Sequence, residues 1–182
     1  MISKIKYACP SLLFNGCLSM LITLLFACTN ASNEYAITLH NDLELYDGWV
    51  NTSKVIKSDH AHSGQYVSKT DATDPYSLGY ITKLWAQQIK TIDKVKAQVY
   101  IYAPSTAQGN LVVSVEENGK PISFRSSAIA DYNTKGNSWV QISTLLKFDK
   151  PITTSEQTEL RVYVAYAGQD PILIDDFDIF IK

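Results

Sequence analysis

Apolar and polar residues alternate with a period of two along most of the chain from Tyr35 onward. Clusters of Gly, Asn, Asp and Pro separate these stretches, and no window keeps the spacing of an amphipathic helix. The clearest case runs from Lys94 to Ala103. One face of that stretch is apolar and carries Val95, Ala97, Val99 and Ile101. The pattern predicts strands with one face in the core and the other in water.

The pair Asn118-Gly119 predicts a two-residue hairpin turn, because both residues tolerate the positive φ that such a turn requires. Residues Leu111 to Ser126 would then form two paired strands around it. The predicted cross-strand pairs are Glu117 with Lys120, Val115 with Ile122, Val113 with Phe124, Ser114 with Ser123, and Val112 with Arg125. This register places the large apolar residues on one face and Arg125 on the other.

Three further strands are expected, at Trp139–Phe148, Leu160–Tyr166 and Ile172–Ile181. The last is apolar on both faces apart from its acidic residues Asp175, Asp176 and Asp178, so we expect it to be central or covered on both sides. Many short strands with turn signals between them are typical of an all-β domain. The sequence therefore predicts one antiparallel β-sandwich.

The N-terminal segment differs in composition from the rest of the chain. Lys4 and Lys6 precede an apolar run, Leu12 to Phe26, which ends at Cys28. This layout is typical of a secretory signal, and the alternative is an uncleaved membrane helix over about Tyr7 to Ala27. All three cysteines of the chain, Cys9, Cys17 and Cys28, lie here. We therefore expect the folded domain to have no disulfide bond.

Leu25, Ala27 and Cys28 resemble the cleavage box of bacterial lipoproteins, although Phe26 departs from it because a smaller residue is usual there. The resemblance implies a signal peptide at 1–27, a lipidated Cys28 with a tether at 28–35, and a binding domain at 36–182. It places the protein in the cell envelope, held to a membrane by the N-terminal lipid. Thr29, rather than Asp, after the cysteine favours the outer membrane. The sequence leaves open whether the domain faces the periplasm or the cell surface.

Three motifs resemble the galactose-binding-like β-sandwich of bacterial carbohydrate-binding modules and outer-membrane lipoproteins. They are Asn41-Asp42-Leu43-Glu44 with Gly48-Trp49, then 61–66 (Ala-His-Ser-Gly-Gln-Tyr), then 174–179 (Ile-Asp-Asp-Phe-Asp-Ile). The resemblance covers nearly all of the predicted mature chain and implies a jelly-roll sandwich.

The same resemblance implies a structural calcium ion. Its candidate ligands are the carboxylates of Glu44, Asp175 and Asp176 and the backbone carbonyls of Ser63 and Gly64. Calcium takes six to eight oxygen ligands, which such a set begins to supply. Residue parity favours Asp175 over Asp176, because Asp175 would share a face with Leu173, Phe177 and Ile179. The alternative is that these acids cap turns or face solvent.

Sugars are bound by exposed aromatic rings with polar groups beside them. The candidates on outward faces are Tyr100, Tyr102 and Tyr163, with Arg125 and Arg161 as polar partners. Tyr76, Tyr80 and Trp85 are candidates in or near loops, whereas Trp49 and Trp139 are assigned to the edge of the core. The alternative for each tyrosine is a purely structural role, since tyrosine is a good strand former.

The sequence contains no nucleophile elbow, phosphate loop or zinc-site spacing. His60 and His62 are close enough in sequence to share a metal, but a pair in a loop of this kind is more often solvated. A formal net charge of −2 argues against binding to nucleic acid. We therefore expect a binding protein rather than an enzyme, with carbohydrate as the leading ligand. The alternative is an envelope lipoprotein whose sandwich docks a protein partner.

Overall fold

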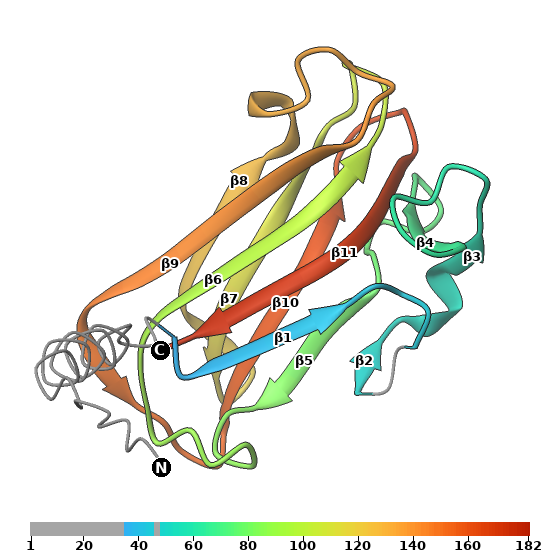
Figure 1. Cartoon of the computed structure of the whole chain (residues 1–182). Coiled ribbons are helices and arrows are strands. Elements are labelled where there is room, and N and C mark those ends of the chain that lie inside the picture. Colours follow the sequence, from blue (N-terminus) through green and yellow to red (C-terminus); the bar gives the residue numbers. More distant parts are fainter. Residues whose placement is uncertain (1–34, 46–47) are drawn as a thin grey trace, which may run out of the picture. The chain divides into compact units, whose positions relative to one another are not determined.

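Two antiparallel sheets face each other in the computed structural model, which describes residues 35–45 and 48–182 (Figure 1). The strands are β1 (Ile37–Asn41), β2 (Trp49–Val50), β3 (Val55–Lys57), β4 (Tyr66–Thr70), β5 (Gly79–Lys83), β6 (Thr91–Tyr102), β7 (Gly109–Glu117), β8 (Lys120–Ala128), β9 (Val140–Thr153), β10 (Thr158–Tyr166) and β11 (Ile172–Ile181). Two short 3-10 helices occur at Thr52–Lys54 and Ile129–Asp131. The predicted all-β sandwich is confirmed. The predicted signal peptide and Cys28 lie outside the described residues.

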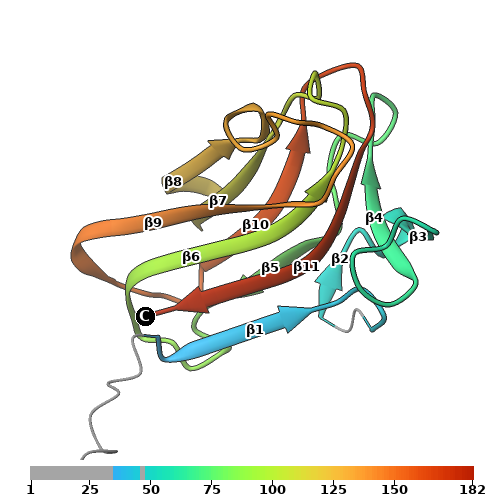
Figure 2. The ribbon, with the colours of Figure 1, turned by 45° about the horizontal axis from the view of Figure 1, so that its top comes forward.

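Sheet A has the strand order β3-β4-β11-β6-β9. β4 pairs with the first part of β11, and β1 pairs with its second part, so β11 is flanked on both sides along its length (Figure 2). The prediction that the last strand is central is therefore confirmed. Sheet B has the order β2-β5-β10-β7-β8. We call the face of each sheet that is turned away from the other sheet its outer face.

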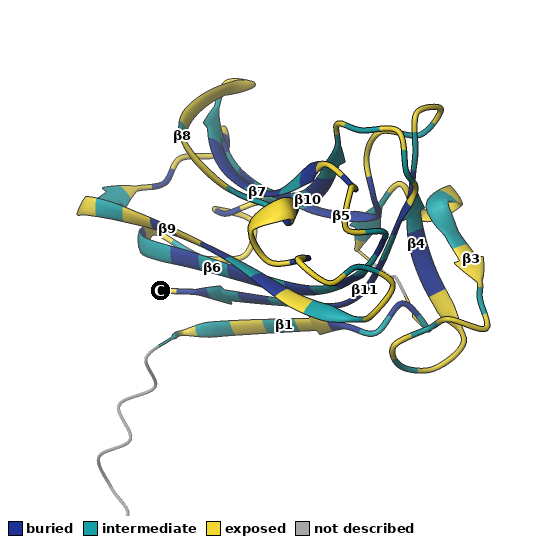
Figure 3. Cartoon of the chain, turned by 90° about the horizontal axis from the view of Figure 1, so that it is seen from above, coloured by how far each residue is buried: buried dark blue, intermediate teal, exposed yellow. Residues whose placement is uncertain are grey.

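The core lies between the sheets, where buried residues of one sheet face those of the other (Figure 3). The predicted inward set of β6 (Val95, Ala97, Val99 and Ile101) is fully buried, and so are Leu160, Val162 and Val164 of β10. Trp49 packs against the edge of this core, as predicted, with its ring on those of Tyr80 and Phe177. No helix among the described residues has the length and apolar character needed to cross a membrane.

The hairpin between β7 and β8 forms as predicted, but its register differs beyond the first two pairs. A β-bulge places Val115 opposite Ser123 and Val113 opposite Arg125. Of the five expected pairs, only Glu117 with Lys120 forms. The pairs of Val115 with Ile122, Val113 with Phe124, Ser114 with Ser123 and Val112 with Arg125 are wrong. The bulge inserts one extra residue into β8, an edge strand, and this reverses which side chains face the core. Ile122 and Phe124 are accordingly exposed.

A second bulge interrupts β11 between Asp175 and Asp178, and Asp176 has a φ of 50°. Before the bulge, Ile172 and Ile174 face the core. After it, the core residues are Phe177, Ile179 and Ile181. Asp175 pairs with Tyr100 and lies with it on the outer face of sheet A. The expectation that Asp175 shares a face with Phe177 and Ile179 is wrong, because the extra residue changes the parity of the strand.

Phe177 of β11 and Phe124 of β8 provide a test of these faces. Phe177 is fully buried beside Trp49, whereas Phe124 is 65% exposed on β8. Phe177→Ala should lower the free energy of unfolding by about 3–5 kcal/mol, because it leaves a cavity in the core. Phe124→Ala is the matched control and should change it by less than about 0.5 kcal/mol. Urea denaturation of both variants measures the difference, and similar losses would contradict the observed register.

Candidate functional site

The residues predicted to bind ligand lie on different faces of the sandwich. Tyr100 and Tyr102 are on the outer face of sheet A, on β6, whereas Arg161 and Tyr163 are on the outer face of sheet B, on β10. Arg125 is opposite Val113, a core residue, and so points to the inner side of the edge strand β8. The predicted set therefore does not form one site, because it combines two sheets whose outer faces point in opposite directions.

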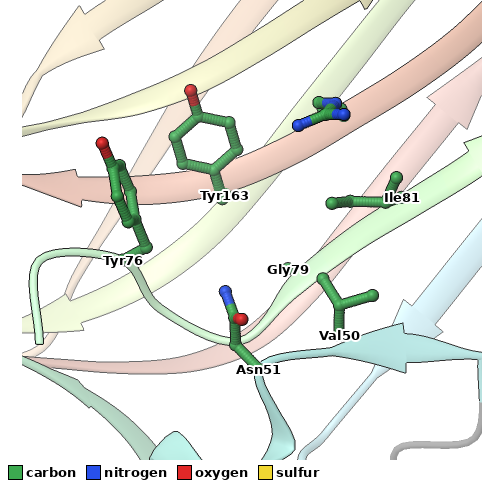
Figure 4. A pocket seen from close by; sticks show the side chains of 7 residues that line it. Val50, Asn51, Tyr76, Gly79, Ile81 and Tyr163 are labelled. Carbon is green, nitrogen blue, oxygen red and sulfur yellow. The ribbon is translucent and has the colours of Figure 1, made fainter. Parts of the chain in front are cut away.

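A pocket of about 390 Å³ lies on the outer face of sheet B (Figure 4). It is lined by Val50, Asn51, Tyr76, Gly79, Ile81, Arg161 and Tyr163. The pocket thus combines β2, β5 and β10 with the segment that precedes β5. That segment is held in place by an isolated bridge between Tyr76 and Ala165 and by a hydrogen bond from the Ser77 amide to the Val164 carbonyl.

Two tyrosine rings form one side of this pocket. Tyr76 and Tyr163 have ring centroids 5.6 Å apart and an interplanar angle of 83°, an edge-to-face arrangement (Figure 4). Tyr76 is 53% exposed, so its ring is open to a ligand. Burial raises the pKa of the Tyr163 phenol, which therefore stays protonated and able to donate a hydrogen bond at neutral pH.

Glycine at position 79 leaves the floor of the pocket free of a side chain. A Cβ atom there would lie 3.0 Å from the Val162 carbonyl oxygen and 3.2 Å from the Tyr163 Cβ, so a side chain would press against β10. Beside it, Asn51 has a φ of 61°, and its amide donates a 3.1 Å hydrogen bond to the Ser77 carbonyl. These two residues let β2 and β5 frame an open concave surface.

The charge of the pocket is balanced by a chain of ion pairs. The Arg161 guanidinium lies 2.6 Å from a Glu159 oxygen through Nη2 and 3.1 Å from a Glu116 oxygen through Nε. Lys83 lies 3.4 Å from the other Glu159 oxygen. Two cations therefore face two carboxylates, and Arg161 is not an isolated positive charge.

On the outer face of sheet A, Tyr100 and Tyr102 are covered by histidines of the β3–β4 loop, residues 58–65. His62 stacks on Tyr100 with centroids 3.8 Å apart, and His60 stacks on Tyr102 at 5.2 Å. Trp139 contacts the rings of His62 and Tyr102. The assignment of Trp139 to the core edge is therefore wrong. Its position just before β9 brings it to the outer aromatic cluster instead.

Asp175 holds this loop against sheet A. Its Oδ2 accepts hydrogen bonds from the amides of His62 (2.8 Å) and Ser63 (3.1 Å), and its Oδ1 accepts one from the amide of Asp176 (2.8 Å). The side chain is fully buried, and this burial raises its pKa from 3.8 to about 6. The carboxylate thus satisfies loop amides that would otherwise be left unpaired.

The other predicted calcium ligands hold the same loop. Asp176 accepts a hydrogen bond from the Ser63 hydroxyl at 2.7 Å and lies against the His62 ring nitrogen. Glu44 Oε1 accepts from the amides of Gln65 and Tyr66. Gly64 is packed so closely that a Cβ atom there would lie 2.1 Å from Glu44 Oε1. The five predicted residues therefore lie close together: Ser63 and Gly64 belong to the β3–β4 loop, and Glu44, Asp175 and Asp176 contact this loop or its junction with β4.

This arrangement does not fit a calcium ion, which needs six to eight oxygen ligands. Both oxygens of Asp175 and both of Asp176 already face nitrogen or hydroxyl partners. Within residues 35–45 and 48–182, no group of three or more His, Cys, Asp or Glu side chains is placed to hold a metal. Calcium at this loop stays a prediction from the resemblance, and nothing below depends on it.

The remaining aromatic candidates have different positions. Tyr80 is buried in the core, whereas Trp85 is 51% exposed in the turn between β5 and β6. Sequence reasoning missed the pocket residues Val50, Asn51, Gly79 and Ile81. The glycine before Tyr80 was their one available signal, because a glycine within a strand often marks a close approach of backbones.

No family model matches the chain, and no curated protein matches it. Among solved structures, the C-terminal family 22 carbohydrate-binding module of Clostridium thermocellum Xyn10B aligns with a TM-score of 0.52 and 13% identity, over 82% of this chain and 96% of that one. A xylan-binding domain of family 22 aligns with a TM-score of 0.52 and 12% identity, over 81% and 94%. The N-terminal family 22 and GH10 modules of C. thermocellum xylanase 10B, complexed with xylohexaose, align at 0.50 and 13%, over 82% and 29%.

These similarities show the fold. The described domain has the β-sandwich architecture of carbohydrate-binding modules. At 12–13% identity they do not transfer a ligand, and the site has to be argued from this chain's own residues.

The raised pKa of Asp175 predicts a pH dependence of stability. Because Asp175 binds its proton more tightly in the folded state (pKa about 6) than in the unfolded state (3.8), its contribution to the free energy of unfolding falls as pH rises between these values. The fall amounts to at most about 3 kcal/mol. Asp175→Asn removes this titration. Relative to the unmutated domain, the variant should therefore gain stability between about pH 4 and about pH 7.

Urea denaturation at the two pH values measures this gain, and a difference between the two proteins that does not change with pH would contradict it. Adding calcium to the same experiment decides the calcium prediction. A calcium-dependent rise in the free energy of unfolding would mean that the loop rearranges to hold the ion.

Proposed function

We propose that the domain binds a neutral polysaccharide in the pocket formed by β2, β5 and β10. The observation that carries the proposal is the pocket of about 390 Å³. It brings two tyrosine rings together with polar groups whose charges are neutralised by ion pairs. A sugar ring presents C–H groups that pack on an aromatic face and hydroxyls that need hydrogen-bond partners. Tyr76 and Tyr163 supply the faces, and Arg161, Asn51 and the Tyr163 hydroxyl supply the polar groups.

Charge favours a neutral ligand over an acidic one. Glu116 and Glu159 neutralise Arg161, and a carboxylated sugar would have to displace one of these carboxylates to gain an ion pair. Neutral hydroxyls can instead share the guanidinium donors that point away from the two glutamates. The fold supports the same class of ligand, since the aligned structures include modules described as xylan-binding.

We propose binding rather than catalysis at this site. Hydrolysis of a glycosidic bond needs a pair of carboxyl groups that are free to act as acid and as base or nucleophile. The two carboxylates that contact the arginine of this pocket are both held in ion pairs with it. They hold Arg161 in position, which is a structural role.

We further propose that Cys28 carries a lipid that anchors the domain in the cell envelope, at the outer membrane. The support is the lipoprotein-like run Leu25 to Cys28. The sequence after Cys28 contains no cysteine, so Cys28 has no disulfide partner within the domain. A tethered binding domain would hold a polysaccharide close to the membrane.

Protein docking is the second candidate function, and one observation favours it. Ile122 and Phe124 are 53% and 65% exposed on the edge strand β8, where apolar side chains are unusual. A partner bound there would leave the tyrosine pocket free.

Removal of a pocket ring should weaken glycan binding. Tyr76→Ala and Tyr163→Ala should each raise the dissociation constant for a neutral polysaccharide by at least about tenfold, because each deletes a stacking face at the centre of the site. Affinity electrophoresis in gels containing xylan, β-glucan or galactan measures the effect. Tyr100→Ala, on the opposite sheet, is the matched control and should bind normally. Tyr163→Phe separates the contribution of the ring from that of the hydroxyl.

The same gels should show no retardation by polygalacturonate. Equal binding of acidic and neutral polymers would contradict the proposed neutral ligand. If no polysaccharide slows the domain, and Ile122→Ser with Phe124→Ser abolishes co-purification of an envelope protein, the docking alternative holds instead.

Replacement of Cys28 should separate the domain from the membrane. Cys28→Ala removes the predicted lipid attachment, so the protein should move from the membrane fraction to the soluble fraction of the envelope. Its melting temperature should not change, because the core lies within residues 35–182. Fractionation followed by thermal unfolding measures both properties. A Cys28→Ala protein that stays wholly with membranes would exclude the lipid as the anchor.

A further inference from the structure

Phe124 lies on the same face of sheet B as the tyrosine pocket. Ile81 on β5 is directly opposite Arg161 on β10. Arg161 is opposite Ser114 on β7, and Ser114 is opposite Phe124 on β8. Side chains of directly paired residues project from the same side of a sheet. Because Ile81 and Arg161 line the pocket, Phe124 is on the pocket's face as well, at the β8 edge of the sheet.

The packing of the domain does not account for the position of Phe124. Its side chain is 65% exposed and does not belong to the core between the sheets. Ile122, two residues away on the same strand, is 53% exposed, so the two side chains form an apolar surface together. Apolar surface on the outside of a folded domain often marks a place where something binds.

Small neutral side chains form the floor between the pocket and Phe124. Ser114, which separates Arg161 from Phe124, is only 5% exposed. In the next row, Tyr163 is opposite the partly buried Val112. Neighbouring strands lie about 4.8 Å apart, so Phe124 is about 10 Å from Arg161 across the sheet. A ligand that extends from Tyr163 to Phe124 would therefore cross only small side chains and displace no ion pair.

Charged residues border this floor along one side. Lys83, Glu159 and Glu116 are paired with one another across β5, β10 and β7, in the row beside Arg161. Ion pairs join these three residues and Arg161 into one network. An uncharged floor with a polar border suits a sugar chain, whose rings present C–H faces and whose edges carry hydroxyls.

We propose that Phe124 is an outlying subsite of the glycan site, so that the domain binds a chain of several sugar residues laid across β10, β7 and β8 (Figure 3). This inference rests on the proposed function of the pocket. One sugar ring would stack on the pair Tyr76 and Tyr163, and another ring farther along the chain would stack on Phe124. The site would then select for chain length, because a short oligosaccharide held at the tyrosines does not reach the phenylalanine.

The position of Phe124 also distinguishes this role from protein docking at the edge of β8. A docking surface has no need to share a row with the residues of the pocket, whereas an outlying subsite requires it. The ring of phenylalanine offers a stacking face without a hydroxyl. Its contribution should therefore come from the ring alone.

Isothermal titration of the purified protein with xylobiose and xylohexaose tests the outlying subsite. If β-glucan or galactan retards the protein more strongly than xylan in the gels described above, the corresponding oligosaccharides replace these probes. Phe124→Ala should weaken binding of xylohexaose about five- to tenfold, because a stacking face is lost. Binding of xylobiose should change by less than about twofold. Phe124→Tyr keeps the ring and should bind xylohexaose within about twofold of the unmutated protein.

Leu145→Ala is the matched control, because Leu145 is 49% exposed on β9 of the opposite sheet; it should bind both probes normally. Tyr163→Ala should weaken binding of both probes. Equal weakening of both by Phe124→Ala, or weakening of neither, would overturn the outlying subsite and leave the pocket proposal standing. If the unmutated protein binds neither probe and no polysaccharide retards it, the proposed function fails and this inference fails with it.

Discussion

The bulge at Asp175 and Asp176 is the constraint on which the rest of the domain depends. β11 is the strand that β1, β4 and β6 all pair with, so any change in its parity affects the whole of sheet A. The extra residue lets Ile174 and Phe177 both face the core while Asp175 turns outward to bind the β3–β4 loop. That loop in turn covers Tyr100 and Tyr102. Burying a carboxylate is costly, and three backbone amides offset the cost.

The outer faces of the two sheets consequently differ in how far their aromatic residues are covered. On sheet A the loop closes over the aromatic residues of β6, so their rings contribute to packing rather than to an open surface. On sheet B no loop among residues 35–45 and 48–182 covers β10 in a comparable way, and Tyr163 and Arg161 line the pocket beside Tyr76. Residues of the same type, at the same alternating positions of their strands, thus serve stability on one face and the proposed recognition on the other.

Alternation was enough to predict the sandwich and the inward faces of β6 and β10, because burial follows the period of an undisturbed strand. The central position of β11 followed instead from its apolar residues on both faces. Alternation failed where a single residue was inserted. The bulges near Val115 and Asp175 have no marker as strong as Asn118-Gly119, and each reversed the faces assigned beyond it. The pocket was predicted only in part. Arg161 and Tyr163 follow from strand parity. The approach of Asn51 and Gly79 to β10 depends on strand pairing, for which the glycine before Tyr80 is the one local signal.

The pairing of β1 with β11 has a consequence for when the chain can fold relative to its synthesis. Sheet A needs its C-terminal strand in the middle, so β1, β4 and β6 have no shared neighbour until residues 172–181 have been synthesised. Contacts between the two ends of a chain are slow to form, because a large loop must close first. A polypeptide that cannot complete a sheet before its C-terminal strand is made stays unfolded, and able to pass through a narrow channel, for longer. If the chain is exported unfolded, as the proposed lipid anchor implies, this topology would itself delay folding until the C-terminal strand has also crossed the membrane.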